Sequence, residues 1–273
     1  MQQQVEYHIQ VKKKTRMEYF VDKGSVVREI WGKSDTILFI FAGASAEFAL
    51  NKAVDWLYFT GKLPADPLGR LFSTVTYARQ IVFSELHEAH AAIDKITAIH
   101  AAVENSRQAK IPDWAYRDVL FMLIHYSIAA FELLERKLND PEKEEMYRVF
   151  LAIGSRMNLK DLPADYKTWL GVRREHLLAD LQKSNYTVDL YKQYRKHLGR
   201  FRFWLLLESQ KMVVPDIVQE LLNFKKIKWV RLVIPSYRFS RIFKLDSTIR
   251  AIILPGKYKA EIKALDFKEE SGD

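Results

Sequence analysis

The chain has 273 residues, of which 48% are hydrophobic and 13% aromatic, and none is cysteine. This much apolar surface excludes an intrinsically disordered chain, and the absence of cysteine excludes disulfides, thiolate metal sites and a catalytic cysteine. The formal net charge is +9, but the 43 basic residues are interleaved with 34 acidic ones, so we predict no nucleic-acid partner. Two basic groups, Lys12–Lys14 and Lys225–Arg231, leave open a peripheral contact with a membrane surface.

Residues 1–24 are polar and basic and lack the apolar segment of a signal peptide, so we expect an N-terminal arm and a cytoplasmic protein. A helical pattern begins at Val26 and continues to about residue 225. After it, Pro235 and Pro255 interrupt short apolar pieces. The sequence therefore predicts an all-α protein with a single multi-helix domain over 25–225 and a small irregular C-terminal extension over 226–273.

The first long helix is predicted over Ile37–Phe59. Its apolar run is too short to span a bilayer, because charged residues follow within the same helix. Glu47, Asn51 and Asp55 share one face at spacings of four residues. Two interpretations are open: a solvated stripe, which is favoured, or a polar wall facing a cavity.

The next two helices are predicted over Pro67–Ser84 and Glu85–Val103. Asp66 is a suitable N-cap, and Pro67 fits the first helical turn. The helical period places Thr74 on the apolar stripe of the first helix and Arg70 at its edge. On the second helix, His100 lies on the apolar seam and is predicted to be buried.

Five further helices follow, with Asp140 as a plausible cap for the second of them. They are predicted over Trp114–Leu138, Pro141–Met157, Tyr166–Lys183, Val188–Lys211 and Pro215–Phe224.

Each polar residue of the two central helices has two interpretations. His100 is either a core histidine bonded to a carbonyl or an iron ligand. Arg70 is either a snorkelling charge or half of an ion pair, or else a cavity-rim group that hydrogen-bonds a haem propionate or polarises bound oxygen. Thr74 either bonds back to its own helix or donates to a bound ligand.

A non-haem metal site is the weakest alternative. It would use the group Glu85, His87, Glu88 and His90, which lacks the spacings E-x-x-H and H-E-x-x-H. A solvated face is the favoured interpretation of that group.

Two motifs resemble a known family. The run D-P-x-G-R-L-x-x-T-x-x-Y spans Asp66–Tyr77, and I-x-x-I-H spans Ile96–His100. With weaker matches at Ala130–Glu132 and Leu162–Tyr166, these residues resemble the family of the fungal MpaB oxygenase and the bacterial rubber oxygenase, or latex-clearing protein. The resemblance covers roughly residues 25–225.

The resemblance implies an all-helical, globin-like core that holds haem b. His100 would be the proximal iron ligand, and Arg70 and Thr74 would lie in the haem pocket. The implied reaction is the oxygenation or oxidative cleavage of a hydrophobic, unsaturated substrate, isoprenoid or lipid-like, by dioxygen.

The chain also departs from the family pattern. Many members carry His-Pro where this chain has Ala46-Glu47, Trp-x-His where it has Asp118-Val119-Leu120, and a distal lysine where it has Ser73. The nearest replacements are His125 and Lys52. These departures favour the alternative of a cofactor-less binding or structural protein, in which side chains such as Phe72, Phe83 and Phe121 fill the space beside His100.

Overall fold

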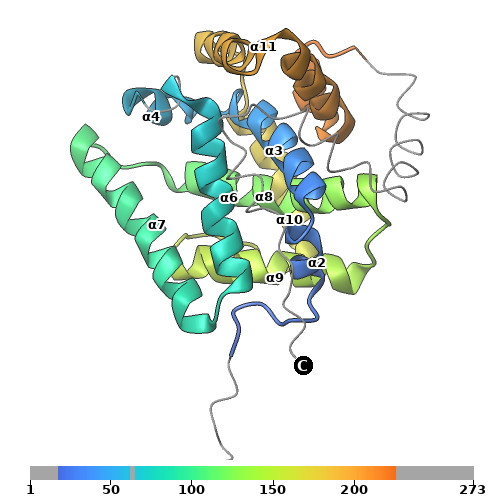
Figure 1. Cartoon of the computed structure of the whole chain (residues 1–273). Helices are drawn as coiled ribbons and strands as arrows, with labels where there is room; N and C mark the ends of the chain where they lie inside the picture. The colour runs from blue at the N-terminus through green and yellow to red at the C-terminus, as the bar shows by residue number, and fades with distance from the viewer. Residues whose placement is uncertain (1–17, 62–64, 226–273) are drawn as a thin grey trace, which may run out of the picture.

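A computed structural model describes residues 18–61 and 65–225. These residues form ten α-helices and, apart from two isolated bridges, no β-structure, so the predicted all-α class is confirmed (Figure 1). The predicted C-terminal extension, most of the N-terminal arm and nearly all of both basic groups lie outside the described residues. No described helix is both long enough and apolar enough to cross a membrane.

The helices follow the predicted order with small shifts at the ends, except that the helix predicted over Ile37–Phe59 is divided in two. In chain order they are α2 (Val26–Trp31), α3 (Ser34–Phe48), α4 (Val54–Phe59), α6 (Pro67–Phe83), α7 (Leu86–Arg107), α8 (Asp113–Leu134), α9 (Asp140–Arg156), α10 (Tyr166–Asp180), α11 (Asn185–Val213) and α12 (Asp216–Leu221).

The core is centred on the packing of α3 against α8. Ile37 and Ile40 on α3 and Phe121 and Phe131 on α8 are fully buried. Burying such a side chain stabilises the fold by about 1.5–3 kcal/mol. α6 and α7 pack against each other along one flank of the molecule (Figure 1), and α11 packs on α3.

The single long helix predicted over Ile37–Phe59 is wrong, because the chain leaves the helix between Phe48 and Val54. Asn51 forms an antiparallel bridge with Leu181, in which Lys52 donates its N–H to Asp180 O and Gln182 donates to Leu50 O. The Asn51 side chain also accepts from Ala53 N at 2.8 Å, a local bond that competes with the helix. The break therefore joins the end of α3 to the end of α10.

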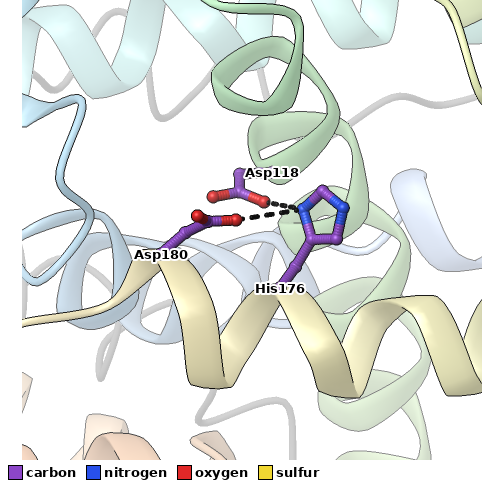
Figure 2. Close-up of side chains that lie close together, drawn as sticks. All are labelled: Asp118, His176 and Asp180. Atoms are coloured by element: carbon purple, nitrogen blue, oxygen red, sulfur yellow. Dashed lines mark hydrogen bonds and ion pairs between the residues drawn. The ribbon is translucent and has the colours of Figure 1, made fainter.

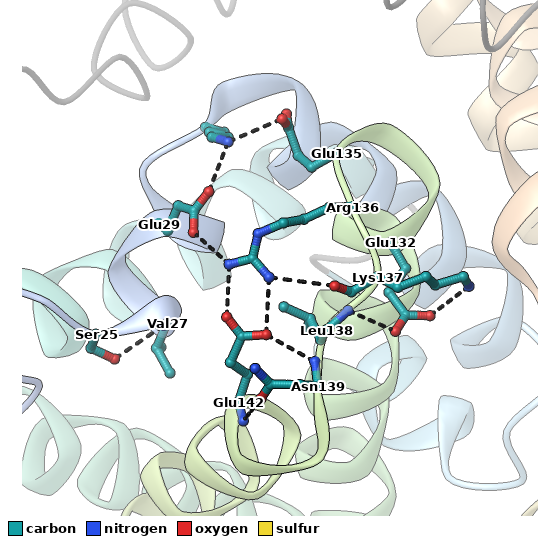
Figure 3. A network of polar contacts seen from close by, with 11 residues as sticks. Ser25, Val27, Glu29, Glu132, Glu135, Arg136, Lys137, Leu138, Asn139 and Glu142 are labelled. Atoms are coloured by element: carbon teal, nitrogen blue, oxygen red, sulfur yellow. Dashed lines mark hydrogen bonds and ion pairs between the residues drawn. The ribbon is translucent and has the colours of Figure 1, made fainter.

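α9 begins one residue earlier than predicted, and Asn139 caps it rather than Asp140. Asn139 and Glu142 form a reciprocal capping box. Arg136 binds Glu142 through both terminal nitrogens, at 2.9 and 2.7 Å, and also reaches Glu29 on α2 (Figure 3). The start of α9 is thereby tied to α2 and to the end of α8.

α11 begins at Asn185, capped by Ser184, and is not straight. Gly199 inside it has φ +72°, a left-handed conformation that glycine adopts readily. The residues after this kink start a new helical direction.

Candidate functional site

The site that the sequence predicts lies between α6 and α7. Asp66 caps α6 as predicted, and its carboxylate accepts from Gly69 N at 3.1 Å. This cap sets the start of the helix and therefore the direction in which Arg70 and Thr74 point.

Arg70 and Thr74 are both half-buried. Arg70 donates from Nη1 to Ser73 Oγ at a long 3.4 Å, and burial lowers the pKa of its guanidinium. The Thr74 hydroxyl donates to the Arg70 carbonyl at 3.2 Å. The back-bonded interpretation of Thr74 therefore describes this structure, whereas the Arg70 guanidinium is weakly held by its own helix.

His100 on α7 is half-buried rather than fully buried, but its Nδ1 atom is enclosed and has no hydrogen-bond partner among the described residues. The Tyr116 ring packs against the imidazole with its centroid 5.1 Å away and the planes at 76°. Burial, followed by the charge of Arg70, lowers the pKa of His100 to about 4, against a smaller opposing effect of Glu104. The imidazole is therefore neutral near pH 7, which is the form that binds iron.

Glu104 holds the outer side of this site in place. Its carboxylate accepts from the Tyr116 hydroxyl at 3.1 Å, from Lys110 Nζ at 2.7 Å and from Ile111 N at 3.0 Å. These bonds fix Tyr116, and through its ring they fix the orientation of His100. The structure thus brings Arg70, His100 and Tyr116 together, while the Thr74 hydroxyl is used within α6.

The other histidines of α7 do not form a metal site. His87 is exposed and lies 3.5 Å from Glu85, and His90 packs edge-on against Phe20. In the part of the chain that the structure describes, the group of side chains arranged to hold a metal ion lies elsewhere.

A second polar cluster occupies the core between α3, α8 and α10. Glu47 is fully buried, and its Oε2 accepts from Arg173 Nη2 at 2.5 Å and from the Tyr126 hydroxyl at 2.8 Å. Asn51 is buried as well, whereas Asp55 is half-exposed and pairs with Arg107 at 2.7 Å. The favoured interpretation of this face as a solvated stripe is wrong for Glu47 and Asn51, since both are buried with polar partners.

The cluster continues toward the C-terminal end of α10 (Figure 2). Asp118 Oδ1 lies 2.5 Å from His176 Nδ1, and Asp180 Oδ2 lies 3.3 Å from the same nitrogen. Asn51 Nδ2 donates to the second oxygen of Asp118 at 2.6 Å. Asp118, His176 and Asp180 were not identified as site residues from the sequence. The signal that could have found two of them was the four-residue spacing of His176 and Asp180 on one helix.

The two proposed replacements for the missing histidines also lie beside α10. Lys52 Nζ donates to Ala179 O at 2.6 Å, and His125 is close enough to Arg173 for that charge to act on it. Burial, and then the charge of Arg173, lower the pKa of His125 to about 3. Glu47 and Asp118, two of the residues at which the chain departs from the family pattern, belong to the same cluster.

Comparison with known proteins agrees with these motifs. The family model described as "ER-bound oxygenase mpaB/B'/Rubber oxygenase, catalytic domain" matches residues 31–241. This range contains every residue named above in the site around His100 and in the polar cluster around Glu47 and Asp118. Neither the curated proteins nor the solved structures include a significant match. The chain therefore belongs to the MpaB/rubber oxygenase catalytic-domain family.

Proposed function

We propose that this chain is a haem b-dependent oxygenase that acts with dioxygen on a hydrophobic, unsaturated small molecule of isoprenoid or lipid-like type. Membership of an oxygenase catalytic-domain family supports the reaction class. The observation that carries the haem assignment is His100, a neutral histidine whose enclosed Nδ1 has no partner among the described residues and which lies beside a desolvated arginine.

The residues present fit the cofactor. His100 would ligate the iron, since a neutral imidazole is the usual proximal ligand of haem b. Arg70 would bind a haem propionate, because its guanidinium is half-buried and, among the described residues, makes only a long hydrogen bond to Ser73 on its own helix. Haem, when bound, supplies an iron that activates dioxygen.

The remaining residues act on geometry and hydrogen bonding. Tyr116, fixed by Glu104, holds the imidazole plane of His100. Thr74 can donate to a bound ligand after its hydroxyl turns away from the Arg70 carbonyl, which costs one weak bond. In this role Thr74 would orient a bound ligand, while His100 and Arg70 would hold the cofactor.

The test is an absorption spectrum of the freshly purified protein. We expect a Soret band that is lost or strongly shifted in His100→Ala and retained in His87→Ala, an exposed histidine on the same helix. Arg70→Leu should weaken haem binding without abolishing it. A protein that shows no Soret band even after loading with haem, or a His100→Ala variant with an unchanged spectrum, would contradict the proposal.

A haem-free binding protein is the second candidate. It is favoured by Glu47 and Asp118. Glu47 lies where many family members carry a His-Pro pair, and Asp118 lies where they carry a Trp-x-His motif. Both residues are instead buried in a polar cluster. This candidate predicts that the purified protein is fully folded, binds no haem and still binds a hydrophobic ligand.

We further infer that α11 meets an anionic membrane surface. Phe201 and Trp204, which follow the kink at Gly199, are 56% and 46% exposed, and the exposed cation Arg200 adjoins them in the chain. Aromatic and basic side chains together are typical of interfacial helices. The protein should co-sediment with phosphatidylserine vesicles more than with phosphatidylcholine vesicles, and Phe201→Ser should reduce this; equal sedimentation with both would remove the inference.

A further inference from the structure

The group Asp118, His176 and Asp180 has the geometry of a metal site that the haem proposal does not use. One nitrogen and two carboxylate oxygens from these side chains lie within 4.8 Å of one another (Figure 2). Asp118 comes from α8, and the other two residues come from α10. The donors therefore converge from two helices packed against each other.

Helical spacing and a fixed carboxylate build this group. His176 and Asp180 are four residues apart, so they project from one face of α10. Asp118 is 2% exposed, and Asn51 holds its second oxygen at 2.6 Å. Asn51 is in turn fixed by Ala53 N at 2.8 Å. The chain thus orients Asp118 through an outer partner, as is usual for metal-binding carboxylates.

The charges around the group favour a cation. Both carboxylates approach the same nitrogen, His176 Nδ1, which can carry one proton at most. The two carboxylates therefore lie close together on one side of the imidazole, where their negative charges repel each other. A divalent ion between them would remove this repulsion.

The nearby cations are engaged elsewhere. Arg117 pairs with Asp161 at 3.2 Å, Arg173 pairs with Glu47, and Lys52 Nζ donates to the Ala179 carbonyl. The charges of these three cations reduce the negative potential at the group. In the contacts given above, however, each cation binds another acceptor and not a donor atom of the group.

We propose that Asp118, His176 and Asp180 bind one divalent first-row transition-metal ion through Nδ1 and two carboxylate oxygens. A mixed imidazole and carboxylate set suits manganese, iron or zinc better than magnesium or calcium. Three protein ligands leave coordination positions open, as in sites where the metal also binds water or a substrate.

Binding requires a small movement of the side chains. Two ligands on one ion at about 2.1 Å are separated by about 3 Å, more than the 2.5 Å between His176 Nδ1 and Asp118 Oδ1. The side chains of His176 and Asp180 are 13% and 16% exposed, so an ion can reach them and they can part around it.

The experiment is a titration of the full-length, chelator-treated protein with Mn²⁺ and with Zn²⁺. Free Mn²⁺ is followed by electron paramagnetic resonance, and Zn²⁺ is followed by calorimetry. We expect one ion per chain and a melting temperature that rises on binding. Asp180→Asn and His176→Gln should each weaken binding at least tenfold, whereas Glu175→Gln, an exposed carboxylate on the same helix, should not.

Circular dichroism of Asp180→Asn shows whether a loss of metal binding comes from a loss of fold. Asp180 is only half-buried, so its replacement by asparagine should leave the fold intact. The Soret absorption should be unchanged in Asp180→Asn, which separates this site from the His100 site. Absence of stoichiometric binding in the folded protein, or binding that all three variants retain equally, would overturn the proposal.

Discussion

Gly43 on α3 faces the ring of Tyr126 on α8, and its replacement by alanine tests how closely these two helices must approach. A Cβ atom added at Gly43 would overlap Cδ1 and Cε1 of the ring and lie 2.9 Å from Cγ. Tyr126 is fully buried, and its hydroxyl donates to Glu47 at 2.8 Å. The ring therefore cannot move aside without disturbing that hydrogen bond.

The expected change follows from three opposing effects. Alanine is more favourable than glycine inside a helix by about 1 kcal/mol. Overpacking a filled core costs about 1–3 kcal/mol, and weakening a hydrogen bond to a buried acceptor costs about 1–3 kcal/mol more. We therefore expect Gly43→Ala to lower the free energy of unfolding by about 3 kcal/mol.

Urea denaturation followed by circular dichroism measures this value. Gly171→Ala is the matched control, since Gly171 is an exposed helical glycine where an added Cβ meets no atom within 4 Å. It should stabilise the protein by about 0.5–1 kcal/mol. In a Tyr126→Leu background the cost of Gly43→Ala should shrink. A Gly43→Ala protein as stable as the parent, or a cost that is the same in both backgrounds, would show that Gly43 and Tyr126 are not in steric contact.

Three further predictions concern the buried charge, pH and a helix cap. Arg173→Met should destabilise the fold by about 3–5 kcal/mol in denaturant titrations, because it leaves Glu47 buried without its cation; adding Glu47→Leu should recover much of this. His125 has a pKa of about 3 in the folded chain and near 6.5 when unfolded, so the unfolded state binds more protons and stability falls as pH drops below 6.5. Its share of the loss is about 2 kcal/mol at pH 5, which His125→Asn should remove. Asn139→Ala should cost about 1 kcal/mol by thermal melting, through loss of the α9 cap.

Clear outcomes would contradict each of these three. An Arg173→Met protein as stable as the parent would mean that the burial of Glu47 does not depend on the charge of Arg173. An unchanged slope of stability against pH in His125→Asn would show that another group titrates there. For the cap, Asp140→Asn is the control, since Asp140 was the predicted cap and Asn139 is the observed one.

The helices could be predicted because their signals are local. Asp66 and Pro67 mark the start of α6, and the apolar period locates its inner face. The same local rules failed at residues 49–53, because the break depends on hydrogen bonds with Asp180 and Gln182, more than a hundred residues along the chain. A propensity-based interpretation cannot include such a partner.

The proximity of Arg70 and His100 was predictable to the same extent. The motif containing Arg70 and His100 is carried by two neighbouring helices, and the structure places these two side chains close enough for the arginine charge to act on the imidazole. The burial of Glu47 was not predictable, because its cation is Arg173 and the two residues are 126 positions apart. For Asp118, whose partner His176 is 58 positions away, the sequence around it carries no sign of the contact.

The bond between Glu47 and Arg173 also constrains how the chain is made. At about 5–20 residues per second, a ribosome needs roughly 6–25 s to add the 126 residues between them. Until α10 emerges, α3 carries an ionised carboxylate on the surface it will later bury, and desolvating that charge without its partner would be costly. Docking of α3 on α8 is therefore expected to be a late step in biosynthesis, and a chain truncated before α10 should remain incompletely folded, with α3 exposed to chaperones.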